Sequence, residues 1–209
     1  MTKTHSSIAL PLMIMLFGAC SNEKEVTGNE TTMYIKSRCD ISMFEDAPVP
    51  REEMEYIISC GLTAPNYMNT QPWEIRVVDN PDLLAQMSEC MLSDFDSIRI
   101  RQIKSRPTYR NIFKNAPTVA FIGYKDTGYG EIDCGMLGAN MIIAAQSMGY
   151  GSCVLGYPVR FLKSERGQEY FKRLSFSPEY KLLYAIAFGT PKAYPEIRLV
   201  EENKYMYIE

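Results

Sequence analysis

Two short apolar runs constrain the fold of this 209-residue chain most strongly. Pro117–Tyr124 reads Pro-Thr-Val-Ala-Phe-Ile-Gly-Tyr, and Tyr180–Phe188 reads Tyr-Lys-Leu-Leu-Tyr-Ala-Ile-Ala-Phe. A strand that is apolar at successive positions, rather than at alternate ones, is typical of a strand that is buried on both faces. The two runs therefore predict buried strands at the centre of a sheet.

Helix and strand patterns interleave around these runs. Trp73–Val78 alternates apolar and polar residues like a strand, whereas Asn80-Pro81 supplies a cap and a first-turn proline for a helix to about Leu92. We expect further helices over 50–62, 94–106, 131–148 and 158–174, and a glycine-rich turn over 149–156. Because helices outnumber strands and interleave with them, we expect an α+β fold with three layers, in which helices flank a mixed central sheet.

The expected helix over 131–148 is rich in small residues, namely Gly135, Gly138, Ala139, Ala144 and Ala145. Small side chains let a neighbouring element approach a helix closely. The sequence leaves two interpretations open, which are packing inside one core and contact between subunits.

The N-terminus has the pattern of a targeting segment rather than of a fold. Lys3 precedes the apolar run Ile8–Phe17, which is too short for a stable membrane span but suits a signal segment. The run ends in Leu16-Phe17-Gly18-Ala19-Cys20, which resembles a bacterial lipobox with Cys20 as the lipidated residue. We expect a signal segment over 1–20, a flexible tether over 21–32 and a folded domain over 33–209, anchored to a bacterial membrane by lipid alone. Plain cleavage near Ala19, which would give a secreted or periplasmic protein, is the alternative.

Composition excludes several kinds of site. The only histidine is His5, inside the signal segment, so the mature chain lacks the imidazole of hydrolase triads and of histidine-ligated metals. Five cysteines follow Cys20 without a C-x-x-C pair, which argues against a zinc site and a disulfide framework. Basic residues are scattered and the net charge is −3, which gives no reason to expect a nucleic-acid partner. If the chain is an enzyme, a bound cofactor is the economical source of its chemistry.

The connection between the first helix and the first strand holds the clearest candidate motif. It reads Ala-Pro-Asn-Tyr-Met-Asn-Thr-Gln-Pro-Trp over 64–73. Its prolines fix the backbone, and its three side-chain amides each offer a donor and an acceptor. Such a loop could bind a flat heterocycle, such as the pyrimidine edge of a flavin, although an ordinary turn has a similar composition.

This loop resembles the flavin-contacting loop of the nitroreductase family, and further motifs follow in the family's order. Arg38-Cys39-Asp40-Ile41-Ser42 resembles the basic motif near the family's N-terminus, and Ala116-Pro117 leads the central strand. The glycine turn over 149–156 resembles the one that faces the isoalloxazine. Phe188-Gly189-Thr190-Pro191, followed by Arg198, resembles the closing strand and its phosphate-binding residue. The resemblance covers nearly the whole chain after the tether.

The resemblance implies a nitroreductase-like fold, an intertwined homodimer and an FMN at the dimer interface. Backbone near Leu155 or Gly156 would meet the reactive flavin N5, and Arg38 and Arg198 would hold the phosphate. The full set of implied cofactor-binding residues is Arg38, Cys39, Asp40, Ser42, Pro65, Asn66, Tyr67, Asn69, Gln71, Leu155, Gly156, Lys192 and Arg198.

Two residues depart from the family's pattern. Asp40 stands where the family usually has serine, and Ser42 where it usually has arginine or lysine. The loss of a cation and the added carboxylate would weaken the phosphate subsite. Asp40 could instead hold Arg38 in place, and Lys36 could supply the missing charge.

The resemblance implies that NAD(P)H reduces the flavin, which then reduces a nitroaromatic, a quinone or a similar small electron-poor acceptor by a ping-pong hydride mechanism without a metal. We expect residues 94–114 to cover the flavin. Two alternatives stay open. One is a surface lipoprotein that binds a flavin or another flat ligand without turnover, because NAD(P)H is scarce outside the cytoplasm. The other is an FMN-consuming or dehalogenating relative.

Overall fold

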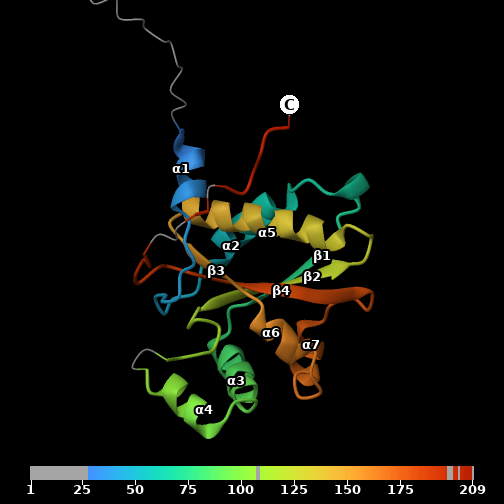
Figure 1. Cartoon of the computed structure of the whole chain (residues 1–209). Helices are drawn as coiled ribbons and strands as arrows, with labels where there is room; N and C mark the ends of the chain where they lie inside the picture. The colour runs from blue at the N-terminus through green and yellow to red at the C-terminus, as the bar shows by residue number, and fades with distance from the viewer. Residues whose placement is uncertain (1–27, 107–108, 197–199, 202, 209) are drawn as a thin grey trace, which may run out of the picture.

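The computed structural model describes residues 28–106, 109–196, 200–201 and 203–208 (Figure 1). In chain order its elements are α1 (Glu30–Ser37), α2 (Arg51–Leu62), the 3-10 helix η1 (Tyr67–Asn69), β1 (Trp73–Val78), α3 (Pro81–Leu92), α4 (Ser97–Lys104), β2 (Thr118–Lys125), α5 (Gly130–Ser147), β3 (Gly151–Leu155), α6 (Tyr157–Leu162), α7 (Gln168–Leu174) and β4 (Tyr180–Gly189). Among these residues, no helix has both the length and the apolar character that a membrane span requires.

The four strands form one sheet in the order β1-β2-β4-β3. The two apolar runs of the sequence are β2 and β4, and they occupy the centre of the sheet as predicted. Phe121 of β2 lies opposite Ala185 of β4, and both side chains are fully buried. Strands β1 and β3 form the two edges of the sheet.

Helices cover both faces of this sheet (Figure 1). On one side α2 and α5 pack on a core that contains Ile57, Met141 and Phe188. On the other side α3, α6 and α7 pack on a second core that contains Met91 and Phe161. The predicted three-layer α+β arrangement is therefore confirmed.

Three details differ from the sequence-based expectations. The sheet is not mixed, because all three strand pairings are antiparallel and the parallel pairing that the structure describes is an isolated bridge between Asp40 and Ser152. Part of the expected turn over 149–156 is the strand β3, because this segment pairs with the edge of β4. The expected helix over 158–174 is two helices, since Gly167 folds back against Phe161: a β-carbon added to Gly167 would lie 2.1 Å from the Phe161 carbonyl oxygen.

The small residues of α5 serve the core on one side of the helix. A β-carbon on Gly138 would lie 2.2 Å from the Tyr184 hydroxyl, which donates a hydrogen bond to the Cys134 carbonyl. The opposite side of α5 remains exposed, with Ile132 at 57% and Met136 at 39% of full exposure. Packing inside one core accounts for Gly138, and contact between subunits stays a prediction for the exposed side.

The described residues include the last positions of the expected tether, so the folded structure extends N-terminal of Met33. The Asn29 side chain accepts a hydrogen bond of 3.0 Å from the Thr32 amide and caps α1, as asparagine commonly does. The last residues of the expected tether, 30–32, are therefore helical. Residues 1–27, which include the expected signal segment and Cys20, lie outside the described residues.

Thr118 links the central sheet to the segment that precedes α2. Its buried hydroxyl accepts a hydrogen bond of 3.0 Å from the Val49 amide. We expect Thr118→Val, which keeps the side-chain volume but leaves this amide unpaired, to lower the free energy of unfolding by about 1–3 kcal/mol in a urea titration. Thr118→Ser keeps the acceptor and should cost about 1 kcal/mol for the lost methyl group. A smaller loss for valine than for serine would contradict this role.

Candidate functional site

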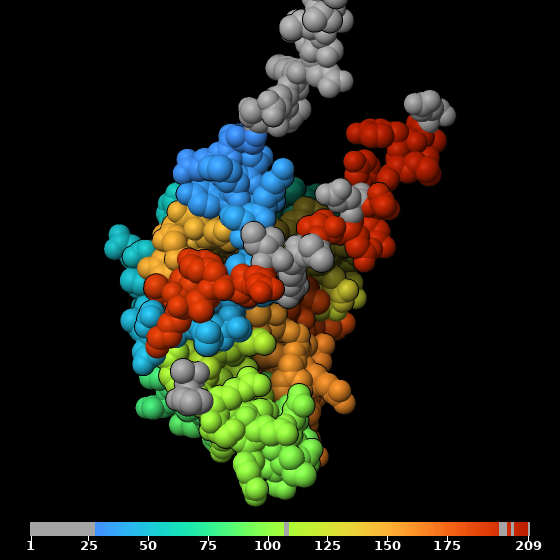
Figure 2. Space-filling model, turned by 60° about the vertical axis from the view of Figure 1, so that its left-hand side comes forward, coloured from blue at the N-terminus to red at the C-terminus, as the bar shows by residue number. Residues whose placement is uncertain are grey.

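A cavity of about 660 Å3 opens where β3 ends, between α4, the start of α6 and the segment 109–115. Its volume is within the range of small-molecule sites. It is lined by Ser42, Met43, Phe95, Arg99, Ile103, Arg106, Tyr109, Asn111, Ile112, Lys114, Asn115, Val154, Leu155, Gly156, Tyr157 and Pro158. Figure 2 shows α4, in green, projecting from the body of the molecule at this end.

Three residues that the sequence assigned to a flavin site meet in this cavity, namely Ser42, Leu155 and Gly156. Strand pairing with β4 fixes Leu155, and Gly156 follows directly as the chain turns into α6. A β-carbon added to Gly156 would meet no heavy atom within 4 Å. A flat ring could therefore approach the backbone here without a side chain in the way.

Two buried polar atoms on the cavity wall have no hydrogen-bond partner among the described residues, and they are the Tyr109 hydroxyl and the Asn111 side-chain oxygen. The Asn111 amide nitrogen donates a 3.0 Å bond to the Ala116 carbonyl, which orients the side chain. Burial, aided by the charge of Glu89, raises the pKa of Tyr109 to about 12, so the hydroxyl stays protonated. Both residues line the cavity, and each carries a buried polar atom without the partner that such atoms usually have.

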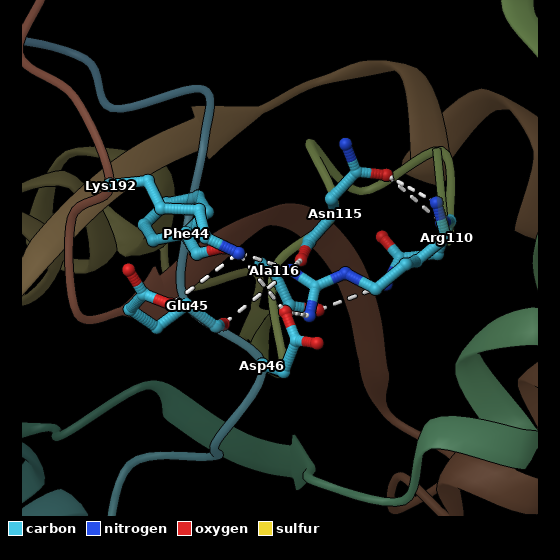
Figure 3. A network of polar contacts seen from close by, with 8 residues as sticks. Phe44, Glu45, Asp46, Arg110, Asn115, Ala116 and Lys192 are labelled. Carbon is cyan, nitrogen blue, oxygen red and sulfur yellow. Dashed lines mark hydrogen bonds and ion pairs between the residues drawn. The ribbon is translucent and has the colours of Figure 1, made fainter. Parts of the chain in front are cut away.

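Arg110 fixes the segment 109–115 through several polar contacts (Figure 3). Its guanidinium pairs with Asp46 and donates to the carbonyls of Phe44 at 2.9 Å and Asn115 at 2.7 Å. Lys114 and Asn115 adopt the left-handed backbone conformation, at φ 61° and 60°. Non-glycine residues in this region carry strain, which the Arg110 contacts offset.

Lys192 lies in an adjoining hollow of about 260 Å3 that shares Met43, Tyr109 and Asn115 with the cavity. Its ammonium group lies 3.4 Å from carboxylate oxygens of both Glu45 and Asp46. The structure therefore brings Lys192 next to the cavity, with its charge balanced by these carboxylates.

Arg38 and Asp40 pair with each other at 2.9 Å and do not line the cavity. The structure shows the contact between Asp40 and Arg38 that the sequence offered as one of two roles for Asp40. Cys39 is half-buried and packs against the core that contains Met91 and Phe161. Arg198, the other expected phosphate ligand, lies outside the described residues.

The amide-rich loop has a strained and well-anchored backbone. Met68, Asn69 and Gln71 have φ values of 48°, 56° and 45°. The Asn66 side chain accepts a 2.9 Å bond from the Gln71 amide, and both oxygens of Asp133 accept from the Tyr67 amide at 3.2 Å. Asp133 belongs to α5 and is 3% exposed. Strain that the surroundings maintain in this way is typical of functional loops.

The loop and the cavity lie at opposite edges of the sheet. The loop leads into β1, whereas the cavity adjoins the end of β3, and three strand spacings separate these edges by about 14 Å. None of the implied loop residues, which are Pro65, Asn66, Tyr67, Asn69 and Gln71, lines the cavity. One chain therefore gathers only part of the site that the sequence implied.

Sequence reasoning placed the cover of the site in residues 94–114 but identified no individual residue there. The structure adds Phe95, Arg99, Tyr109, Asn111 and Lys114 to the cavity. Their spacing follows no motif, because they meet only where the tertiary fold brings α4, the segment 109–115 and the end of β3 around one cavity.

Comparisons with known proteins point to the family that the sequence motifs resemble. The model of the nitroreductase family matches residues 35–190. A protein of Methanothermobacter thermautotrophicus, described as a candidate NADH dehydrogenase/NAD(P)H nitroreductase, is 27% identical over 84% of each chain. A nitroreductase with bound FMN from Desulfitobacterium hafniense is 26% identical, with a TM-score of 0.76 over 88% of this chain and 100% of that one. Rat iodotyrosine deiodinase 1 is 25% identical over 61% of this chain and 52% of its own length.

Asp133 provides a test of how the loop is held. We expect Asp133→Ala to lower the free energy of unfolding by about 1–3 kcal/mol, because the Tyr67 amide loses its partner. Hydrogen exchange should show faster exchange at 66–71 in this variant. Asp82→Ala, which removes an exposed acid from the first turn of α3, should cost less than about 1 kcal/mol and leave that exchange unchanged. Unchanged exchange in Asp133→Ala would contradict the anchoring role.

Proposed function

The chain belongs to the nitroreductase family, and on this premise we propose that it is an FMN-dependent oxidoreductase that uses NAD(P)H to reduce a small electron-poor acceptor. The overall reaction for a nitro group consumes one NAD(P)H and one proton, forms the nitroso compound and releases one water.

The cavity at the end of β3 is the observation that carries this proposal. It has room for a flat ring over Gly156, and its wall holds an unpartnered buried donor and acceptor. These features suit the isoalloxazine of FMN, whose polar edge both donates and accepts hydrogen bonds. The relative from Desulfitobacterium hafniense, which has the same fold, contains bound FMN.

Each side of the cavity has a role in this proposal. The backbone at Leu155 and Gly156 faces the reactive edge of the ring, while Tyr109 and Asn111 hold its polar edge. When bound, FMN supplies the two-electron chemistry by taking a hydride from NAD(P)H and passing it to the acceptor. The protein needs no histidine for this task, because its residues orient the reactants and exclude water.

At the proposed phosphate site, carboxylates lie beside the cations. We assign phosphate binding to Arg38 and Arg198, with Lys192 nearby. Asp40 holds the Arg38 guanidinium at 2.9 Å, and carboxylates also engage Lys192. Because Arg38 and Lys192 are both partly neutralised, we expect weaker FMN retention than a site with uncompensated cations would give.

We further propose a homodimer in which the loop 65–71 of one copy completes the cavity of the other. The separation of loop and cavity across the sheet supports it, as does the exposed apolar side of α5. The C-terminal residues Tyr205, Met206, Tyr207 and Ile208 are 77–85% exposed and extend away from the body (Figure 2). Contact with a second copy would bury such apolar side chains.

The location of the protein is a separate proposal. The pattern of residues 1–20 supports a cell-envelope protein that is attached to a bacterial membrane through lipid on Cys20, with a secreted or periplasmic form as the alternative. Because NAD(P)H is scarce outside the cytoplasm, this location would favour an electron donor that reaches the envelope.

A second candidate function is reductive dehalogenation. The similarity to rat iodotyrosine deiodinase 1 favours it, and the same flavin site could serve a halogenated aromatic acceptor. Turnover with a nitroaromatic but not with a halogenated phenol would exclude it.

The visible absorption spectrum of the purified chain, soaked in FMN, tests the main proposal. We expect flavin bands that bleach when NADH or NADPH is added without oxygen. Bands that persist would indicate a non-catalytic binder, and no bands would contradict the flavin site. Gly156→Val, whose side chain would enter the cavity, should lower flavin occupancy at least tenfold while the circular dichroism spectrum stays the same.

The dimer has its own test. We expect Met136→Arg, which places a charge on the exposed apolar side of α5, to raise the monomer fraction in light scattering and to lower FMN content together with it. Val77→Arg, at an exposed position of β1, should leave the dimer intact. A Met136→Arg protein that remains fully dimeric would contradict an interface at this helix.

A further inference from the structure

The mouth of the cavity carries three cations. Arg99 lies on α4, Arg106 lies just after this helix, and Lys114 lies on the wall next to Asn115. None of the sixteen lining residues is an aspartate or a glutamate. Among the described residues, none of the three side chains forms an ion pair, although the chain as a whole has a net charge of −3.

The acids that lie near this wall are occupied elsewhere. Glu89 pairs with Lys104 at 2.5 Å, and Asp94 pairs with Arg166 at 2.9 Å. Asp96 accepts a 2.8 Å bond from the Arg99 backbone amide and caps α4. The positive charge at the mouth is therefore only partly balanced by the protein.

Aromatic side chains border the same opening. Phe95 and Tyr157 stack with ring centroids 5.5 Å apart, and Tyr109 also lines the cavity. An aromatic border beside cations suits a flat ring that carries a negatively charged group.

We propose that the acceptor of this cavity is an anionic aromatic compound, in which a reducible ring substituent accompanies a carboxylate or another acidic group. This inference rests on the proposed function, because the acceptor would enter over the flavin. Arg99 and Lys114 would bind the acidic group, and Phe95 with Tyr157 would border the ring.

A phosphate could use the same cations, either the phosphate of FMN itself or a phosphate of the nicotinamide donor. If these cations bind a phosphate, the loss of charge at Arg99 should weaken FMN retention or raise the KM for the donor. It would not change how the site distinguishes two acceptors that differ only in charge.

The test compares matched ligands on the full FMN-loaded chain. Benzoate and benzamide, which cannot be reduced, are titrated against the visible flavin spectrum to obtain dissociation constants. The turnover rates of p-nitrobenzoate and p-nitrobenzamide are measured beside them. The variants are Arg99→Gln, Lys114→Gln and, as a control on the same helix, Arg101→Gln, which does not line the cavity.

We expect wild-type protein to bind benzoate more tightly than benzamide. Arg99→Gln and Lys114→Gln should each reduce this preference roughly 2- to 5-fold, the size of effect that exposed ion pairs give, and high salt should reduce it further. The same variants should lower kcat/KM for p-nitrobenzoate relative to p-nitrobenzamide, and Arg101→Gln should do neither.

Each of the following results would overturn the inference. Equal binding of the two ligands by wild-type protein would remove the need for an anionic group. An unchanged preference in both variants, with weaker FMN retention or a higher donor KM, would assign the cations to a phosphate. If the chain oxidises NAD(P)H with menadione but shows no preference for the charged ligand, the proposed function stands and the inference fails. If the chain takes up no flavin, the proposed function and the inference both fail.

Discussion

The strand order β1-β2-β4-β3 is the constraint on which the rest of this structure depends. Two largely buried strands fill the centre, so helices must cover both faces and functional segments are left to the edges. The amide-rich loop leads into the edge strand β1, and Gly156 directly follows the other edge strand, β3. A flavin that contacts both therefore needs a second copy of the chain in our account.

The electrostatic arrangement differs between the two ends of the proposed site. Near the expected phosphate, Arg38 pairs with Asp40 and Lys192 lies beside Glu45. At the mouth, Arg99 and Lys114 have no such partner among the described residues. This distribution favours modest retention of the cofactor together with attraction of an anionic acceptor.

Local sequence patterns were sufficient for the elements that depend on local chemistry. The central strands followed from their unbroken apolar runs, and α3 followed from Asn80-Pro81, whose asparagine accepts a 2.8 Å bond from Leu83. Strand β3 was missed because its glycine-rich segment becomes a strand only by pairing with β4. The direction of strand pairing is likewise a property of the whole chain. In the site, Ser42, Leu155 and Gly156 followed from the family resemblance, whereas Tyr109 and Asn111 could not, since tertiary packing alone brings them to the cavity.

Flavin stoichiometry in mixed dimers tests the central claim most directly. Two differently tagged chains, one with Gly156→Val in the cavity and one with Asp133→Ala beneath the loop, are co-expressed and the mixed dimer is isolated. If the loop of one copy completes the cavity of the other, one of the two sites is intact and the mixed dimer should bind about one FMN per two chains. Each variant alone should bind little. A mixed dimer that binds no more flavin than either variant alone would show that each chain builds its site by itself.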